Sequence, residues 1–234
     1  MTSLSLPAKA LVDPVDGVAA AVEGRRWALP MVALALCASL AGAAGALRWD
    51  PTSTVVSEMA EKGELARASE REVQDGIQQA GRIRLVAGIS GGVTTPLTLL
   101  FIAVALKLAA WLLGAKAPFG KCFTAAAVAM LPIALYHLLF AVVAFHQLGV
   151  TLAQAKTLVP SSLLALSPDA APKLARFLGA VDFFSLWSAA LLGLGFAQAA
   201  EMKKGRALVV GFVLYAMYAA VFLVALPGLS GGPR

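Results

Sequence analysis

Long apolar runs alternate with short polar segments along this chain, and the runs have the length of membrane-spanning helices. An α-helix rises about 1.5 Å per residue, so about 20 apolar residues cross a hydrocarbon core of about 30 Å. Five runs meet this requirement: residues 27–47, about 85–113, 122–148, 179–200 and 207–226. The pattern therefore predicts an all-α integral membrane protein, a bundle of five transmembrane helices.

The segments outside these runs divide the rest of the chain. They predict a cytoplasmic N-terminal tail at 1–26, an extracytoplasmic amphipathic loop at 48–84, a four-helix membrane core at 85–226 and a C-terminal tail at 227–234. Within the loop, apolar residues give only a partial helical face. One or two surface helices are expected there, and Gly63 and Gly76 oppose a single long helix, because glycine weakens helices.

Two prolines lie inside apolar runs, Pro96 in the second and Pro132 in the third. Proline removes an internal hydrogen bond and clashes with the preceding turn. We therefore expect a kink or a break near each. The proline-containing segment 149–177 is interpreted as a re-entrant or interfacial turn.

The fourth run carries small side chains along one helical face. They recur every fourth residue, at Ser185, Ala189, Gly193 and Ala197. Small residues allow a second backbone to approach closely, so this face is predicted to be a packing seam. Asp182 lies near the same stripe, and an ionisable group at the membrane normally turns toward the protein interior or a partner. The predicted helix-packing residues are Asp182, Ser185, Trp187, Ala189 and Gly193.

Composition supports the membrane assignment. The chain has 234 residues, of which 59% are hydrophobic and 14% charged, whereas soluble domains have roughly 25% charged residues. The chain has no room for a separate catalytic domain of ordinary size. The net charge of +6 comes mostly from short loops beside apolar runs, which argues for topology signals and lipid contacts and against a nucleic-acid surface.

The basic loops predict an orientation. With five helices threaded alternately, one side of the membrane receives Arg25, Arg26, Lys116, Lys121, Lys203, Lys204 and Arg206. Positive short loops face the cytoplasm, so the prediction is a multi-pass protein of the cell (inner) membrane with a cytoplasmic N-terminus. Anionic lipid headgroups are the expected partners of Lys203, Lys204 and Arg206.

Three further polar residues lie in the apolar runs: Lys107, His137 and His146. Lys107 is close enough to a run's end for its stem to reach the headgroups. His146 and Asp182 are expected near the same outer boundary, where they either hydrogen-bond two helices together or form part of a proton or ion pathway. His137 lies at midspan and suits an interhelical hydrogen bond.

Motifs of enzymes and cofactor sites are weak or missing. Residues 88–91 read G-x-S-G, the pattern around the nucleophilic serine of rhomboid proteases, but so short a run of small residues arises by chance in a glycine-rich membrane protein. The sequence has no Walker loop, dinucleotide fingerprint or zincin motif. We therefore expect no catalytic residues, cofactor or metal.

Residues 178–210, LGAVDFFSLWSAALLGLGFAQAAEMKKGRALVV, resemble the closing signature of bacterial members of the Yip domain family, named for interacting with Ypt and Rab GTPases. The shared features are Asp182, Phe183 and Phe184, then Trp187, a glycine-containing span and a basic hinge at 203–206. The third run, with MLPIALYHLLF, and the SSLLALSP loop are similar as well. The resemblance implies five helices, a cytoplasmic N-terminus and a group linked in eukaryotes to vesicle trafficking and membrane shaping.

The sequence thus predicts a non-enzymatic multi-pass membrane protein that organises membranes or acts as an adaptor or scaffold. Its expected partners are membrane lipids and other membrane proteins, including a second copy of the chain. Residues 1–26 lack a match to the longer cytoplasmic region of eukaryotic family members, which puts GTPase binding in doubt. The alternative is a small transporter or channel component with a proton- or ion-linked site near Asp182 and His146.

Overall fold

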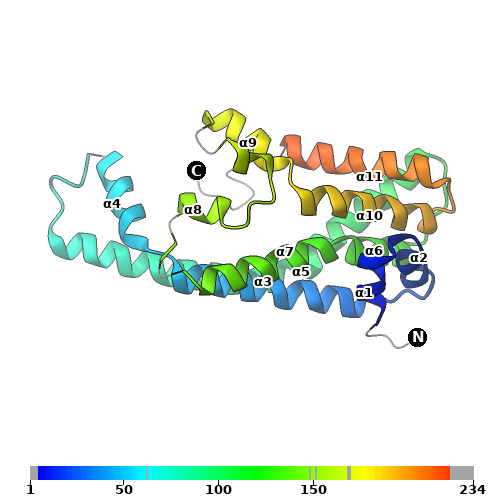
Figure 1. Ribbon diagram of the computed structural model, residues 1–234, viewed down its shortest axis with the longest axis horizontal. Coiled ribbons are helices and arrows are strands. Elements are labelled where there is room, and N and C mark those ends of the chain that lie inside the picture. The colour runs from blue at the N-terminus through cyan, green and yellow to red at the C-terminus, as the bar shows by residue number, and fades with distance from the viewer. Residues whose placement is uncertain (1–4, 62, 148, 151, 168–169, 222–234) are drawn as a thin grey trace.

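The computed structural model describes residues 5–221 except 62, 148, 151 and 168–169, and these residues fold into an elongated helical bundle (Figure 1). The helices of the first half are α1 (Ser5–Val12), α2 (Pro14–Glu23), α3 (Ala28–Arg48), α4 (Pro51–Glu61) and α5 (Glu70–Leu112). Those of the second half are α6 (Phe119–Ala129), α7 (Leu131–Phe145), α8 (Leu152–Thr157), the 3-10 turn η1 (Leu163–Leu166), α9 (Pro172–Ala180), α10 (Phe183–Ala199) and α11 (Lys204–Tyr218).

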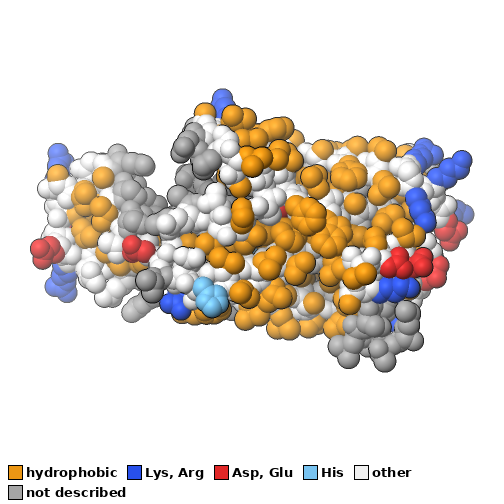
Figure 2. Space-filling view, in the orientation of Figure 1, with side chains coloured by type: hydrophobic (Ala, Val, Ile, Leu, Met, Phe, Trp, Pro, Cys, Tyr) orange, Lys and Arg blue, Asp and Glu red, His pale blue; other side chains and the backbone are white. Residues whose placement is uncertain are grey.

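Among the described residues, four segments are long and apolar enough to cross a membrane: Ala28–Arg48, Ser90–Leu112, Phe119–Phe145 and Lys204–Val221. The helix α10 is apolar but has only 17 residues, a length of about 25 Å. Figure 2 shows hydrophobic side chains over the middle of the visible face and charged side chains mostly toward its ends. The protein is therefore an all-helical membrane protein with four candidate spans and one shorter apolar helix.

The apolar run 179–200 does not form one helix. Its first residues end α9, and the chain turns at Val181 and Asp182 before α10 begins at Phe183. Asp182 has extended backbone angles and its side chain bonds the first N–H groups of α10. A helix-capping residue of this kind begins a helix, which is why α10 is shorter than the apolar run.

The helix α5 is longer than the second apolar run, since its 43 residues begin at Glu70. Ser69 and Glu72 form a reciprocal capping box at this start. The helix α5 continues through both Gly76 and Pro96. The expected break near Pro96 is therefore absent, and Gly76 does not divide the helix. At Pro132 the break is confirmed, because α6 ends at Ala129 and α7 begins at Leu131.

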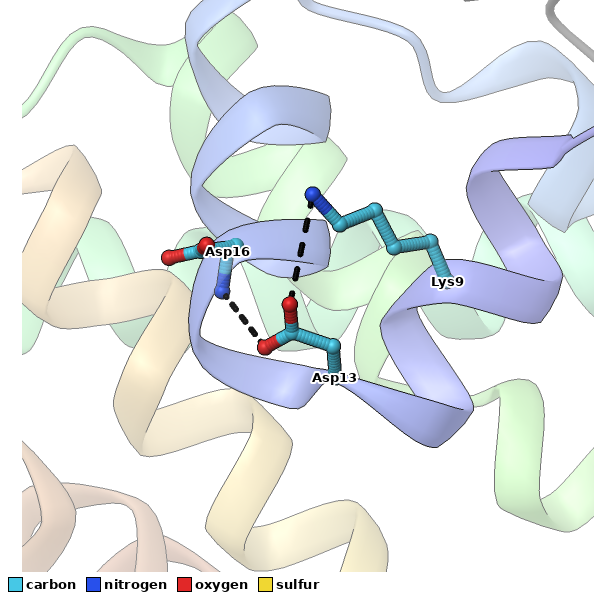
Figure 3. A network of polar contacts seen from close by, with 3 residues as sticks. All are labelled: Lys9, Asp13 and Asp16. Atoms are coloured by element: carbon cyan, nitrogen blue, oxygen red, sulfur yellow. Dashed lines mark hydrogen bonds and ion pairs between the residues drawn. The ribbon is translucent and has the colours of Figure 1, made fainter.

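The segment 1–26, predicted to be a tail, contains two packed helices. Asp13 joins them: its carboxylate accepts a hydrogen bond from the Asp16 backbone N–H and lies 4.0 Å from the Lys9 ammonium (Figure 3). Val18 and Val22 of α2 are fully buried in the main hydrophobic core, and α2 packs on α6 and α10. The α1–α2 pair is therefore part of the bundle.

The main core is made largely of alanine, with a few large side chains. Phe196, Leu99, Leu106 and Leu191 are the largest that are almost fully buried. Alanine-rich helix faces allow the helices to pack closely, which replaces the hydrophobic driving force that is missing between helices in lipid.

Candidate functional site: the Asp182 cluster and the His137 groove

Asp182 is the N-terminal cap of α10. Its carboxylate accepts hydrogen bonds from the backbone N–H groups of Phe184 and Ser185, each at 3.0 Å. It also accepts one from the Ser161 hydroxyl at 3.2 Å. The N-terminus of a helix has unpaired N–H groups and a partial positive charge, so a carboxylate is stabilised there.

Ser161 reaches Asp182 because a short extended segment pairs with the start of α10. The Phe183 N–H donates to the Ser161 carbonyl at 2.9 Å, and the Leu163 N–H donates to the Val181 carbonyl at 3.1 Å. This antiparallel pairing is centred on Ser162 and Asp182. The proline-containing segment before α9 is thereby fixed to the bundle.

Two tyrosines complete what we call the Asp182 cluster: Ser161, Asp182, Ser185, Tyr136 and Tyr215. Tyr136 of α7 lies close enough to Asp182 for an electrostatic interaction, and its ring is 5.6 Å from that of Phe184. Tyr215 of α11 donates to the Ala180 carbonyl and also bonds Ser185. The cluster thus ties α7, α10, α11 and the extended segment together, and the sequence analysis had assigned no role to Ser161, Tyr136 or Tyr215.

The structure does not bring His146 to Asp182. His146 is the C-terminal cap of α7, ten residues beyond Tyr136, which corresponds to about 15 Å along the helix. The ion pairs among the described residues are Lys9–Asp13 and Lys121–Glu201, so Asp182 has no cationic partner in that part of the chain. Its carboxylate is held by neutral donors.

The small residues of α10 lie against α11. A Cβ atom at Gly193 would lie 2.6 Å from the Leu208 Cα, and one at Gly211 would overlap the Ala189 carbonyl oxygen. These helices therefore touch through their backbones. Trp187 is half-buried against the main core, with its ring 5.5 Å from that of Phe183.

The opposite side of α10 makes a second close contact, which the sequence analysis did not identify. A Cβ atom at Gly195 would lie 2.7 Å from the Ala125 Cβ of α6. The only sequence signal for it was the glycine itself, since nothing in the pattern indicates which helix it meets.

A groove of about 520 Å³ runs between α3, α5 and α7, and we call it the His137 groove. Its described lining is Leu34, Ala38, Ala41, Gly42, Gly45 and Ala46 of α3, Gly88, Gly91, Thr95 and Thr98 of α5, and Met130, Ile133, Tyr136, His137 and Phe140 at and along α7. The glycines of the G-x-S-G pattern thus lie in a helix-packing region. Tyr136 belongs to both the groove and the Asp182 cluster, so the two adjoin.

The comparison with protein families agrees with this architecture. A family model, the Yip1 domain, matches residues 8–226. The chain belongs to the Yip1 domain family. The resemblance seen in residues 178–210 is thereby confirmed, and the match begins within α1, so α2 and most of α1 lie inside the Yip1 domain. No curated protein and no solved structure matches the chain.

Several basic residues of this Yip1 domain protein lie at the connections between α5 and α6 and between α10 and α11. Lys107 donates to the Ala117 carbonyl at 2.7 Å, so its ammonium is held at the α5–α6 connection. Lys203, Lys204 and Arg206 are exposed around the start of α11. No three His, Cys, Asp or Glu side chains of the described residues are arranged to hold a metal ion.

Proposed function

We propose that this Yip1 domain protein is a non-enzymatic scaffold of the bacterial inner membrane that binds other membrane proteins through an arm outside the bilayer. The arm consists of α4 and of α5 residues 70–81. The length of α5 carries the proposal: its 43 residues extend about 65 Å, whereas the hydrocarbon core is about 30 Å thick.

The packing of the arm supports this role. The helix α4 folds back on α5, where the Val55 side chain would lie 3.3 Å from a Cβ atom at Gly76. Glu70, Arg71, Gln74, Gln78 and Gln79 of α5 are exposed. Figure 1 shows the arm projecting from one end of the bundle. A supported polar surface of this kind offers a partner a preformed contact area.

The proposal includes five membrane crossings with a cytoplasmic N-terminus. The short link after α10 makes α10 and α11 a hairpin, so α10 crosses most of the bilayer alongside α11. The basic loops lie near one another: Lys121 is 3.8 Å from the Glu201 carboxylate, and a Cβ atom at Gly120 would lie 3.7 Å from the Arg25 side chain. A shared basic end is what the positive-inside rule requires of the cytoplasmic side.

The transporter alternative receives less support from the geometry. Asp182 is engaged as the helix cap of α10. His146 lies at the end of α7, about 15 Å along that helix from Tyr136, the α7 residue near Asp182. The transporter predicts that Asp182→Asn abolishes an ion- or proton-dependent flux in liposomes. The scaffold predicts no such flux in the wild-type protein.

Site-specific photo-crosslinking in native membranes tests the scaffold. A photoreactive residue at Gln74 in the arm should crosslink a defined membrane protein, whereas the same residue at Val209, which is 62% exposed on α11, should crosslink mainly lipid. The charge-reversed arm Arg71→Glu/Asp75→Lys should reduce the Gln74 crosslink at least fivefold with unchanged thermal unfolding. Equal protein crosslinking at both positions contradicts the arm's role.

A reporter fused after Arg234 tests the five crossings. It should report an extracytoplasmic C-terminus, and a cytoplasmic one would overturn the proposed topology.

A further inference from the structure

We infer that the His137 groove is a lipid site, which holds one acyl chain of a glycerophospholipid whose ester carbonyl accepts a hydrogen bond from His137. This inference rests on the proposed embedding of α3, α5 and α7 in the bilayer. It does not depend on a partner of the arm.

The groove lies at membrane depth. Its lining comes from three of the four candidate spans, apart from Gly88, which lies two residues before the second. From Met130 to Phe140 it follows α7 for ten residues, about 15 Å, and on α3 it extends from Leu34 to Ala46, about 18 Å. It is therefore a long, narrow space parallel to the helices, which is the shape of an extended lipid chain.

Small side chains create this space. Gly42 and Gly88 bring α3 and α5 into backbone contact at one level. One turn along, a Cβ atom at Gly92 would again lie 2.6 Å from the Ala35 carbonyl oxygen, whereas one at the neighbouring Gly91 would lie 3.7 Å or more from Ala38, which is ordinary van der Waals contact. The helices thus leave an apolar channel beside their crossing, and in a bilayer the surrounding molecules able to fill it are lipid chains.

Polar side chains line the groove at more than one level, and they are not all satisfied by the protein. The Thr95 and Thr98 hydroxyls donate to carbonyls of their own helix. His137 makes a ring contact with Tyr136, with centroids 5.8 Å apart, but no hydrogen bond with any described residue. A polar side chain in hydrocarbon gains free energy from a partner, and a neutral imidazole has one N–H to donate.

The position of His137 selects the ester region of the lipid. His137 is three residues from the Phe140 end of the groove and seven from the Met130 end. The longer part of the groove extends from His137 toward Met130 and Leu34, the cytoplasmic direction in the proposed topology. Its lining is apolar apart from Thr95 and Thr98, whose hydroxyls are already bonded within α5. The Asp182 cluster adjoins His137 through Tyr136, so a lipid of the outer leaflet would place its ester group at His137 and its acyl chain in the longer part.

Photolabelling in vesicles tests the site. The full-length protein is reconstituted in phosphatidylcholine vesicles that contain a phosphatidylcholine with a diazirine in one acyl chain, and labelled peptides are mapped by mass spectrometry. We expect labelling to concentrate on 38–46 of α3 and 133–140 of α7. Labelling spread evenly over lipid-facing positions, such as the exposed Phe101 and Met217, would overturn the inference. Crosslinks from the groove to a second copy of the chain would overturn it as well.

Matched variants test whether the lipid acyl chain lies in the groove. Gly91→Leu places a large side chain in the space and should reduce groove labelling at least fivefold. Gly81→Leu is the control, because it makes the same change on the same helix where a Cβ meets nothing within 4 Å. Equal labelling of these two variants overturns the inference.

The hydrogen bond is tested by competition between ester- and ether-linked phosphatidylcholines with the same chains. The ester lipid should compete about threefold to tenfold better, the range that one net hydrogen bond gives. His137→Phe should abolish this preference, whereas His146→Phe, at an exposed histidine of the same helix region, should retain it. Equal competition by both lipids with wild-type protein overturns the assignment of His137 and needs no variant to fold. Failure here leaves crosslinking of the arm unaffected, so the two proposals fail separately.

Discussion

Two of the glycine-mediated helix crossings in the bundle differ in outcome. The α10–α11 crossing is closed, because the glycines of both helices meet backbone atoms of the other. The α3–α5 crossing touches at Gly42 and Gly88, and again where Gly92 meets Ala35, but on one side it borders a groove of about 520 Å³. Large side chains of α7, Tyr136, His137 and Phe140, line the open side. Glycine therefore permits close approach, while the third helix determines whether space remains.

The closed crossing gives the largest predicted effect. Gly211→Leu must displace the backbone of α10 at both Ala189 and Gly193. Overpacking usually costs about 1–3 kcal/mol, and we expect at least about 3 kcal/mol here. Thermal or denaturant unfolding in detergent measures it. The control Gly205→Leu, where a Cβ meets nothing within 4 Å on the same helix, should cost less than about 1 kcal/mol, and equal losses would contradict the closed crossing.

The open crossing should tolerate the same change better. Gly42→Leu meets the Gly88 backbone, but α3 can shift into the neighbouring groove, so we expect a loss of about 1–2 kcal/mol. The same variant should narrow the groove and reduce its lipid labelling. Unfolding that is as severe as for Gly211→Leu would show that the groove does not relieve overpacking.

The N-terminal cap of α10, the helix of the closed crossing, should give the next largest effect on the free energy of unfolding. Asp182→Ala removes the acceptor for two backbone N–H groups and Ser161, a change that typically costs about 1 kcal/mol. Asp182→Asn retains a capping oxygen and should cost less than half as much. The free energy of unfolding of both variants checks this, and equal losses would favour a role for the negative charge itself.

The cap of α5 gives the smallest effect, and it depends on pH. Hydrogen bonds from the Ser69 backbone N–H and hydroxyl lower the pKa of Glu72 below its ordinary value. A lowered pKa in the folded state means that the carboxylate stabilises the arm above the ordinary pKa of about 4.3. This contribution is lost as the pH falls through the lower folded value. The hydrogen-exchange protection factors of the first turn of α5, which allow for the slower intrinsic exchange in acid, should therefore fall as the pH is lowered, and Glu72→Gln should remove most of that pH dependence.

The sequence was sufficient for the helices but not for their pairing. Apolar runs of spanning length predicted the membrane helices, and Pro132 correctly marked a break. Asp182 was predicted to be a helix-packing residue and not a helix cap, because the break at Val181 depends on pairing with Ser161, which is distant in sequence. The groove could not be predicted at all, since it exists only through the spacing of three helices.

The N-terminal helices show a signal that the sequence did contain. Val18, Ala21 and Val22 have the spacing of one buried helical face, and the structure buries all three. The segment was predicted to be a tail because it is short and polar and ends in Arg25 and Arg26, directly before the first apolar run. Helical spacing of apolar residues therefore predicts a buried helix face in a short polar segment as it does in a long apolar one.

Burial of α2 has a consequence for the order of assembly. The helix is synthesised before any membrane segment, yet its apolar face packs on α6 and α10, which leave the ribosome much later. Until residue 199 has been made, Val18 and Val22 lack their final neighbours and must be shielded by the lipid surface or a chaperone. The helix α2 thus precedes α6 and α10 in synthesis but reaches its native position only when both are in place.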